Sequence, residues 1–170
     1  SSRKDAFGIN YAKNAGIPYY IIEYKEYKND IEKYSSEITN VLIANRVELV
    51  VMGGFLSFYK IPSQYENRVI NIHPALSPSF SGKGMYGMKV HEAVFNSGVK
   101  YTGCTVHFVD NEYDHGAIIA QSIVEITPED NAKSIKDKVT LKERELYPHV
   151  IKSITENKLR NINGRYFIVN

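Results

Sequence analysis

Apolar positions along the chain recur with two different periods. Helical spacing marks residues 5–14, 30–45 and 85–96 and a long stretch after Thr127-Pro-Glu-Asp130, whereas apolar or alternating runs mark 17–24, 48–52, 69–73, 100–109 and 117–125. The first period is typical of helices and the second of strands. Their alternation predicts an α/β fold, with a mostly parallel, Rossmann-like sheet and helices on both faces. At 170 residues, we expect residues 1–170 to form one domain.

Proline, glycine and asparagine divide these segments. Residues 74–84, with several serines, prolines and glycines, are expected to form a loop, and a short helical turn is expected after Pro62. Pro148 lies inside the last helical pattern and is expected to kink or interrupt it. Asn163-Gly164, between two short apolar runs, predicts a hairpin turn.

Polar side chains follow two of the predicted strands. Asn71 and His73 end the run 69–73, and Asp114 follows the run 103–109. Since alternate side chains of a strand share a face, Asn71 and His73 point the same way, and Pro74 favours extended geometry at His73. An amide, an imidazole and a carboxylate at strand ends can stabilise an oxyanion and transfer a proton. For each residue alone, an ordinary polar group at the end of a strand is the commoner interpretation.

Taken together, these motifs resemble a known family. The segment Asn71-Ile-His-Pro-Ala-Leu76 is followed by Gly103-Cys-Thr-Val-His-Phe-Val109 and by Asp114-His-Gly116. They are similar to the phosphoribosylglycinamide formyltransferases of purine synthesis, and the similarity covers nearly the whole chain. The segments 4–8, 50–55, 82–87, 90–94 and 143–148 also match. The resemblance implies the formyltransferase fold and formyl transfer from 10-formyltetrahydrofolate to the amine of glycinamide ribonucleotide.

The resemblance also implies a role for individual residues. Asn71 and a protonated His73 would donate hydrogen bonds to the oxyanion, and Asp114 would favour the imidazolium and relay the proton. The positions that match the folate pocket are Leu56, Ser57, Phe58, Tyr59, Asn71, Asp110, Asn111, Glu112, Tyr113 and Asp114. The positions that match the ribonucleotide side are Pro74, Thr140, Leu141, Lys142 and Glu143. Many relatives have arginine at the position of Ser57 and an acidic residue at that of Asn111. His107 is expected to support the wall of the site.

One part of the family pattern is absent from this chain. Relatives normally begin with a further strand, a Gly-x-Gly-Ser-Asn loop that holds the substrate phosphate, and a helix. The sequence is therefore expected to be truncated at its N-terminus relative to the family, without a phosphate-binding loop.

Composition and charge exclude several other classes of protein. With 43% hydrophobic and 24% charged residues the chain has the composition of a globular protein, and its basic residues are dispersed around a net charge of +2. Nucleic-acid binding is therefore not expected, and no apolar run approaches the roughly 18 residues of a membrane helix. A single cysteine, Cys104, excludes an intramolecular disulfide and fits a cytoplasmic location. We expect no metal, small-molecule partners only, and a monomer or homodimer.

Two other functions use similar residues. Formyltetrahydrofolate hydrolase would use the same Asn, His and Asp with water as acceptor, although the match around Glu143 favours the ribonucleotide enzyme. A non-catalytic folate-binding protein is the other alternative, and the complete set of Asn71, His73 and Asp114 argues against it.

Overall fold

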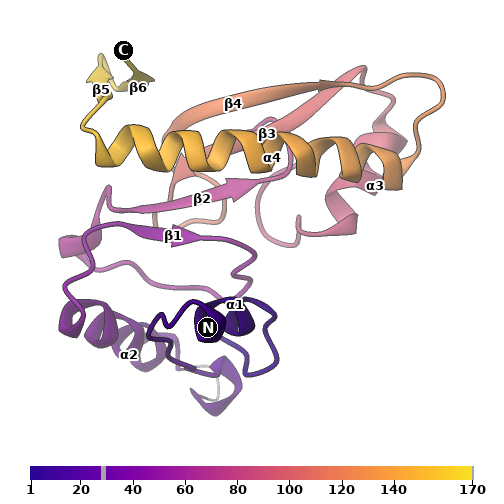
Figure 1. Ribbon diagram of the computed structural model, residues 1–170. Coiled ribbons are helices and arrows are strands. Elements are labelled where there is room, and N and C mark those ends of the chain that lie inside the picture. Colours follow the sequence, from indigo (N-terminus) through magenta and orange to yellow (C-terminus); the bar gives the residue numbers. More distant parts are fainter. Residues whose placement is uncertain (28–29, 170) are drawn as a thin grey trace.

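The computed structural model describes residues 1–27 and 30–169 (Figure 1). The helices are α1 (Gly8–Asn14), α2 (Ile31–Ala44), α3 (Met88–Ser97) and α4 (Ala132–Thr155), with short 3-10 turns η1 (Tyr24–Tyr27) and η2 (Ser63–Tyr65). The strands are β1 (Val50–Met52), β2 (Val69–His73), β3 (Tyr101–Phe108), β4 (Ile118–Glu125), β5 (Leu159–Ile162) and β6 (Arg165–Ile168). The predicted α/β class is confirmed.

The main sheet has the strand order β1-β2-β3-β4. The pair β1–β2 is parallel, as the sequence predicted, but β2–β3 and β3–β4 are antiparallel. The sheet of the described residues is therefore mixed rather than mostly parallel. The short loop between β3 and β4 explains the second antiparallel pair, since a parallel connection needs a crossover of a dozen or more residues.

One face of the sheet is covered by the two C-terminal helices. Val90 and Val94 of α3 and Val139 of α4 form a fully buried cluster with Cys104 of β3, while Val150 extends the core toward β2. Helix α4 runs along β3 and β4 in Figure 1 and contacts both strands. Cys104 is thus a core residue, as expected for a small apolar side chain on a strand.

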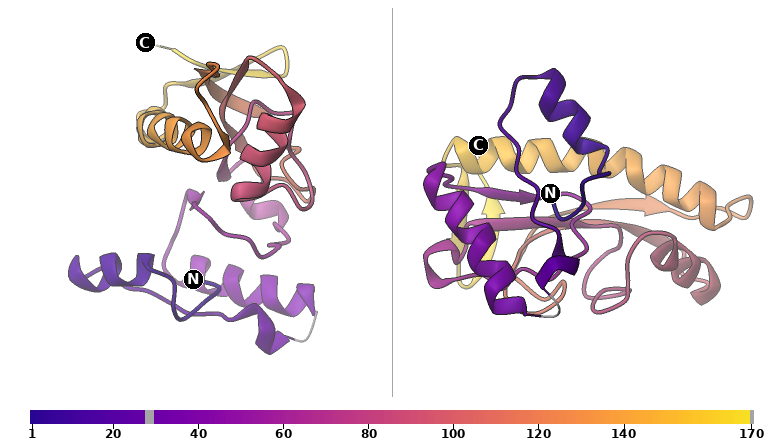
Figure 2. Two further views of the ribbon diagram at one scale, coloured as in Figure 1. Left: turned by 90° about the vertical axis from the view of Figure 1, so that its right-hand side faces the viewer. Right: turned by 90° about the horizontal axis from the view of Figure 1, so that it is seen from below.

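The other face carries the polar side chains of β2. Ile70 and Ile72 pack toward α4, so the alternation of the strand turns Asn71 and His73 to the opposite side. Near β1, Ile38 and Leu42 of α2 pack against a cluster that includes Val69. Figure 2 shows α1 and α2 beyond β1, at the opposite end of the molecule from the β5–β6 hairpin.

The segment expected as a strand over residues 17–24 is not one. Residues 17–23 have no regular secondary structure, and two bonds join them to the N-terminus: Ile22 N–H donates to the Ser1 carbonyl (2.9 Å), and the Ser1 amino group donates to the Tyr20 carbonyl (2.7 Å). Ile17 and Tyr19 remain 57% and 44% exposed. Tyrosine and isoleucine supply β propensity, yet a strand also needs a hydrogen-bonding partner along its length, and β1 pairs only with β2 among the described strands.

Other boundaries agree with the sequence or shift slightly. The helix expected from residue 5 begins at Gly8, and the one expected from residue 85 begins at Met88. Pro148 does not interrupt α4, which continues to Thr155 because buried residues on both sides of the proline, Val139 and Val150, hold it against the sheet. The hairpin turn at Asn163-Gly164 is confirmed, with φ of 53° and 79°. Among residues 1–27 and 30–169, no helix is both long and apolar enough to cross a bilayer.

Candidate active site

The end of β2 and the loop between β3 and β4 bring Asn71, His73 and Asp114 together. Asp114 Oδ2 lies 3.4 Å from His73 Nδ1, and Asp114 Oδ1 lies 3.7 Å from His107 Nε2. Asn71 Nδ2 lies 3.4 Å from His107 Nε2. The fold thus brings Asp114 to Asn71 and His73, about 40 positions earlier in the chain, and His107 lies beside this cluster.

Backbone geometry explains the position of Asp114. Its φ is +52°, a conformation that aspartate and asparagine tolerate better than most residues. Two residues later, a Cβ at Gly116 would lie 1.9 Å from the Phe108 carbonyl oxygen, so only glycine lets the loop pack against β3. The Asp-x-Gly motif therefore has a physical basis, because the aspartate turns the loop and the glycine holds it close to the strand.

His73 is almost fully buried, with 3% of its surface exposed. Its Nε2 lies 2.8 Å from the Phe80 carbonyl, and its Nδ1 faces the Asp114 carboxylate. Both ring nitrogens therefore face acceptors, an arrangement that suits the doubly protonated ring. Asp114 is also bound to the same loop, because its Oδ2 accepts a hydrogen bond from the Gly82 amide (3.0 Å).

His107 orients Asn71. Its Nδ1 donates to the Phe108 carbonyl (2.7 Å), which leaves Nε2 to accept from the Asn71 amide. Burial lowers the pKa of His107, which keeps this ring neutral at pH 7. One N–H of the Asn71 amide is thereby directed into the wall, and the second is available to a ligand.

A cleft of about 760 Å³ opens in front of these residues. Asn71, His73, Pro74 and Asp114 lie on one wall, and Thr140 and Glu143 of α4 lie on another. Burial raises the pKa of the Glu143 carboxyl, and no ion pair of the described residues involves it. Glu143 is therefore an acceptor without a cationic partner inside the cleft.

The sequence-predicted ligand residues divide into three groups. Leu56 and Tyr113 line the cleft beside the catalytic candidates. An adjoining pocket of about 70 Å³, which shares Asn71 and Asp114 with the cleft, is lined by Ser57, Phe58, Tyr59, Asp110 and Glu112. The remaining residues, Asn111, Leu141 and Lys142, line neither space.

The contacts of this third group explain their positions. Asn111 bonds both backbone groups of Ile61 and so anchors its own loop. Leu141 is 59% exposed, and Lys142 Nζ pairs with Glu145 at 2.8 Å on the surface of α4. Tyr59, although it reaches the adjoining pocket, is 3% exposed and its hydroxyl bonds Thr39 (2.9 Å).

Several residues of the cleft were not identified from the sequence. Lys83, Tyr86 and Arg144 line it, as does Tyr147, whose hydroxyl donates to the Met52 carbonyl (2.7 Å). All four belong to the segments 82–87 and 143–148, whose match to the family was the available signal. The bond that Tyr147 makes to the end of β1 could not be read from the sequence, because 95 positions separate the two residues.

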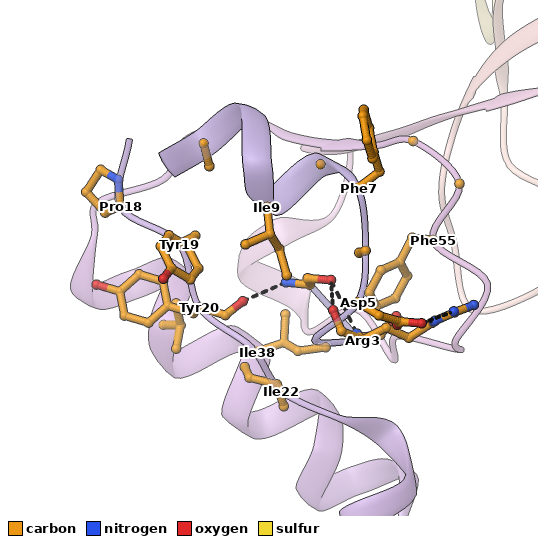
Figure 3. Close-up of a pocket in the computed structure, with 18 of the residues that line it drawn as sticks. Arg3, Asp5, Phe7, Ile9, Pro18, Tyr19, Tyr20, Ile22, Ile38 and Phe55 are labelled. Carbon is orange, nitrogen blue, oxygen red and sulfur yellow. Dashed lines mark hydrogen bonds and ion pairs between the residues drawn. The ribbon is translucent and has the colours of Figure 1, made fainter. Parts of the chain in front are cut away.

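A second hollow, of about 730 Å³, lies between the segment around Tyr20 and helices α1 and α2 (Figure 3). Ile9, Pro18, Ile22 and Ile38 line it, together with an exposed Arg3–Asp5 ion pair. None of the sequence-predicted site residues is among its lining residues. The candidate catalytic side chains therefore lie in the neighbouring cleft and not in this hollow.

Within residues 1–27 and 30–169, no group of three or more His, Cys, Asp or Glu side chains is arranged to hold a metal ion.

Comparison with known proteins identifies relatives over nearly the whole chain. The family model described as Formyl transferase matches residues 1–151. Phosphoribosylglycinamide formyltransferase of Haemophilus influenzae is 34% identical over 94% of this chain and 74% of its own length. The chloroplastic phosphoribosylglycinamide formyltransferase of Arabidopsis thaliana is 37% identical over 94% of this chain. The chain spans about half of the curated plant relatives, 56% of the Arabidopsis protein and 51% of that from Vigna unguiculata.

Solved structures of phosphoribosylglycinamide formyltransferases also resemble this chain over its whole length. Glycinamide ribonucleotide transformylase 1 from Symbiobacterium toebii superposes with a TM-score of 0.89 at 30% identity, covering 100% of this chain and 78% of that one. Phosphoribosylglycinamide formyltransferase from Anaplasma phagocytophilum superposes with a TM-score of 0.83 at 32% identity, covering 100% and 83%. The architecture described above is that of these proteins.

Proposed function

Since the chain belongs to the formyl transferase family, and within it to the phosphoribosylglycinamide formyltransferases, we propose that it transfers a formyl group from 10-formyltetrahydrofolate to the amine of glycinamide ribonucleotide. The observation that carries this proposal is the cluster of Asn71, His73 and Asp114 on the wall of one cleft. The proposed reaction is part of purine biosynthesis and one-carbon metabolism, with the folate as cosubstrate.

The reaction requires one new bond and one broken bond. The substrate amine attacks the formyl carbon, and the former carbonyl oxygen takes a negative charge in the tetrahedral intermediate. The free N–H of Asn71 and the charge of a protonated His73 stabilise that oxygen. The C–N10 bond then breaks, and the folate nitrogen leaves with a proton.

Asp114 serves the proton transfer in this scheme. Its carboxylate accepts the proton that the attacking nitrogen loses, directly or through water, and returns it to the leaving N10. The 3.4 Å separation from His73 Nδ1 is longer than a good hydrogen bond, so a substrate oxygen can share that N–H with the carboxylate. The Nε2–H of His73 remains on the Phe80 carbonyl and keeps the ring in place.

The two substrates would occupy different walls of the cleft. We propose that the folate binds along Leu56, Tyr113 and the adjoining pocket, where the rings of Phe58 and Tyr113 lie 5.2 Å apart and offer an aromatic surface. The ribonucleotide would lie along Pro74, Thr140 and Glu143, whose carboxylate can accept a hydrogen bond from a ribose hydroxyl. Leu141 and Lys142 line neither space, and in this proposal they act only through the helix that carries Glu143.

We extend the proposal to the surroundings of the enzyme. A single buried cysteine suits a reducing compartment, and we propose a cytoplasmic location with a monomeric or homodimeric state.

The test is a steady-state assay with both substrates and purified protein. Formyl loss from the folate should depend on glycinamide ribonucleotide. The variant His73→Ala should lower turnover by about 10² to 10³, as expected for removal of one group that stabilises an oxyanion, and should leave the folate dissociation constant within about threefold. The control is His149→Ala, at an exposed histidine of α4.

Two results would contradict the proposal. Formyl loss that proceeds equally well without the ribonucleotide would indicate hydrolysis by water. Near-normal turnover of His73→Ala would remove the histidine from the mechanism.

A further inference from the structure

A buried polar network lies beneath the loop that follows His73. In the register of the sheet, Thr105 of β3 pairs with His73 of β2 on one side and with Gln121 of β4 on the other. Thr105 is fully buried, although threonine carries a hydroxyl. Thr105 and Gln121 therefore connect the interior of the sheet to β2, the strand that carries His73.

Thr105 uses the whole hydrogen-bonding capacity of its hydroxyl. Its Oγ1 donates to the Ala75 carbonyl (2.7 Å) and accepts from the Ser77 amide (2.9 Å) and from Gln121 Nε2 (2.9 Å). A hydroxyl has one donor and two acceptor positions, and all three are occupied here. Gln121 Nε2 also donates to the Ser77 carbonyl at 3.0 Å.

These bonds fix the backbone immediately after the catalytic histidine. Ala75 and Ser77 are held against β3 and β4, and the chain then turns, with Ser79 N–H donating to the Leu76 carbonyl (3.1 Å). The turn brings the Phe80 carbonyl to His73 Nε2. Gly82, further along the same loop, donates to Asp114.

We propose that Thr105 and Gln121 are positioning residues, which set the orientation of the His73 ring through the loop of residues 75–82. Neither side chain reaches the cleft, so both act on the reaction through the Phe80 carbonyl. The kinetic part of this inference rests on the proposed formyl transfer. The structural part, the link from Thr105 to the His73 ring, does not depend on any substrate.

The chain supplies a matched control on the same strand. Thr102 of β3 is 2% exposed, and its Oγ1 has no hydrogen-bond partner within residues 1–27 and 30–169. Thr102→Val and Thr105→Val make the same chemical change at two buried positions of one strand. Only the second removes a hydroxyl that holds the loop.

The experiment compares Thr105→Val, Thr105→Ser, Gln121→Met and Thr102→Val in the full chain. Thr105→Val and Gln121→Met should lower kcat about tenfold or more with little change in the folate KM, since a displacement of 1 Å in a reacting group can cost about 10²-fold. Thr105→Ser, which restores the hydroxyl, should remain within about threefold of the parent, as should Thr102→Val.

The second measurement is the ¹⁵N-edited NMR signal of the His73 Nε2–H, assigned by its loss in His73→Ala. It should be visible in the parent, in Thr105→Ser and in Thr102→Val, and it should shift or broaden in Thr105→Val and Gln121→Met. A merely structural role would lower thermal stability and leave this signal unchanged in the folded fraction. If Thr105→Val does not fold, Gln121→Met carries the same prediction.

The possible outcomes separate the two hypotheses. Normal kcat and an unchanged His73 signal in both Thr105→Val and Gln121→Met would overturn the positioning role while leaving formyl transfer intact. A parent protein without formyl transfer, whose His73 signal still responds to these two substitutions, would overturn the proposed function and support the positioning role.

Discussion

Asp114→Asn tests the electrostatic core of the proposed mechanism. The substitution removes the charge and the proton acceptor but changes little else. Asparagine also tolerates the φ of +52° at this position, and its Oδ1 can still accept the Gly82 amide bond. The variant is therefore expected to fold as the parent does, and its free energy of unfolding should fall by no more than the attraction lost between Asp114 and His73.

The magnitude of the catalytic effect follows from the geometry. At 3.4 Å, a carboxylate and an imidazolium attract by about 5 kcal/mol with an effective dielectric constant near 20, and by about 1 kcal/mol in bulk water. The side chains of His73 and Asp114 are 3% and 14% exposed, so the pair lies between these limits. A loss of about 3 kcal/mol corresponds to about 10²-fold in rate, and the lost proton acceptor adds about 10² or more.

The assay is steady-state kinetics with both substrates, combined with denaturant unfolding of the same sample. Turnover should fall by about 10² to 10⁴, whereas the free energy of unfolding should fall by no more than about 3 kcal/mol. Asp137→Asn, at an exposed aspartate of α4, removes the same formal charge away from the cleft and should leave both unchanged. Turnover of Asp114→Asn within about threefold of the parent would refute the reasoning and leave Asp114 as a turn-forming residue.

Three further predictions concern stability. Tyr147→Phe removes the hydroxyl that ties α4 to the carbonyl groups of Met52 in β1 and Ile70 in β2, and should cost about 1–2 kcal/mol, or about 3–6 °C in the thermal midpoint; an unchanged midpoint would contradict this. Burial raises the pKa of Glu143, so its charged form destabilises the fold once the pH exceeds the ordinary value near 4.3. Glu143→Gln should therefore melt higher than the parent at pH 8 and equally at pH 3.5, and the reverse order would exclude a desolvated carboxylate. A hydrogen bond from Lys138, and next in size one from the Thr127 backbone, hold the pKa of Asp130 below its usual range. The ionised carboxylate therefore stabilises the fold above about pH 4, and this contribution is lost as the pH falls through the lower pKa of the folded state. Asp130→Asn should lower the midpoint at pH 7, and the difference from the parent should shrink steadily as the pH falls below about 4, as an acid titration of both proteins would show; a constant difference would argue against the ionic contact.

Local sequence determined most of the elements and part of the site. Strand β2 ends at His73 as expected, and alternation alone placed Asn71 and His73 on one face because the side-chain period of a strand is a local property. The Asn163-Gly164 turn and the N-cap of α2 at Asp30 are equally local. The family motifs added the expectation that Asp114 would join this face.

Tertiary structure decided the rest, because the deciding contacts join residues far apart in the chain. Residues 17–24 have the composition of a strand but are not paired as one, and Pro148 stays inside α4 because packing on both sides of it outweighs one lost backbone bond. The ring of His73 is held by a carbonyl seven residues away, and that carbonyl is held in turn by Thr105 and Gln121 from two other strands. Periodicity specifies which face a side chain occupies, but only the folded chain specifies which partner it meets there.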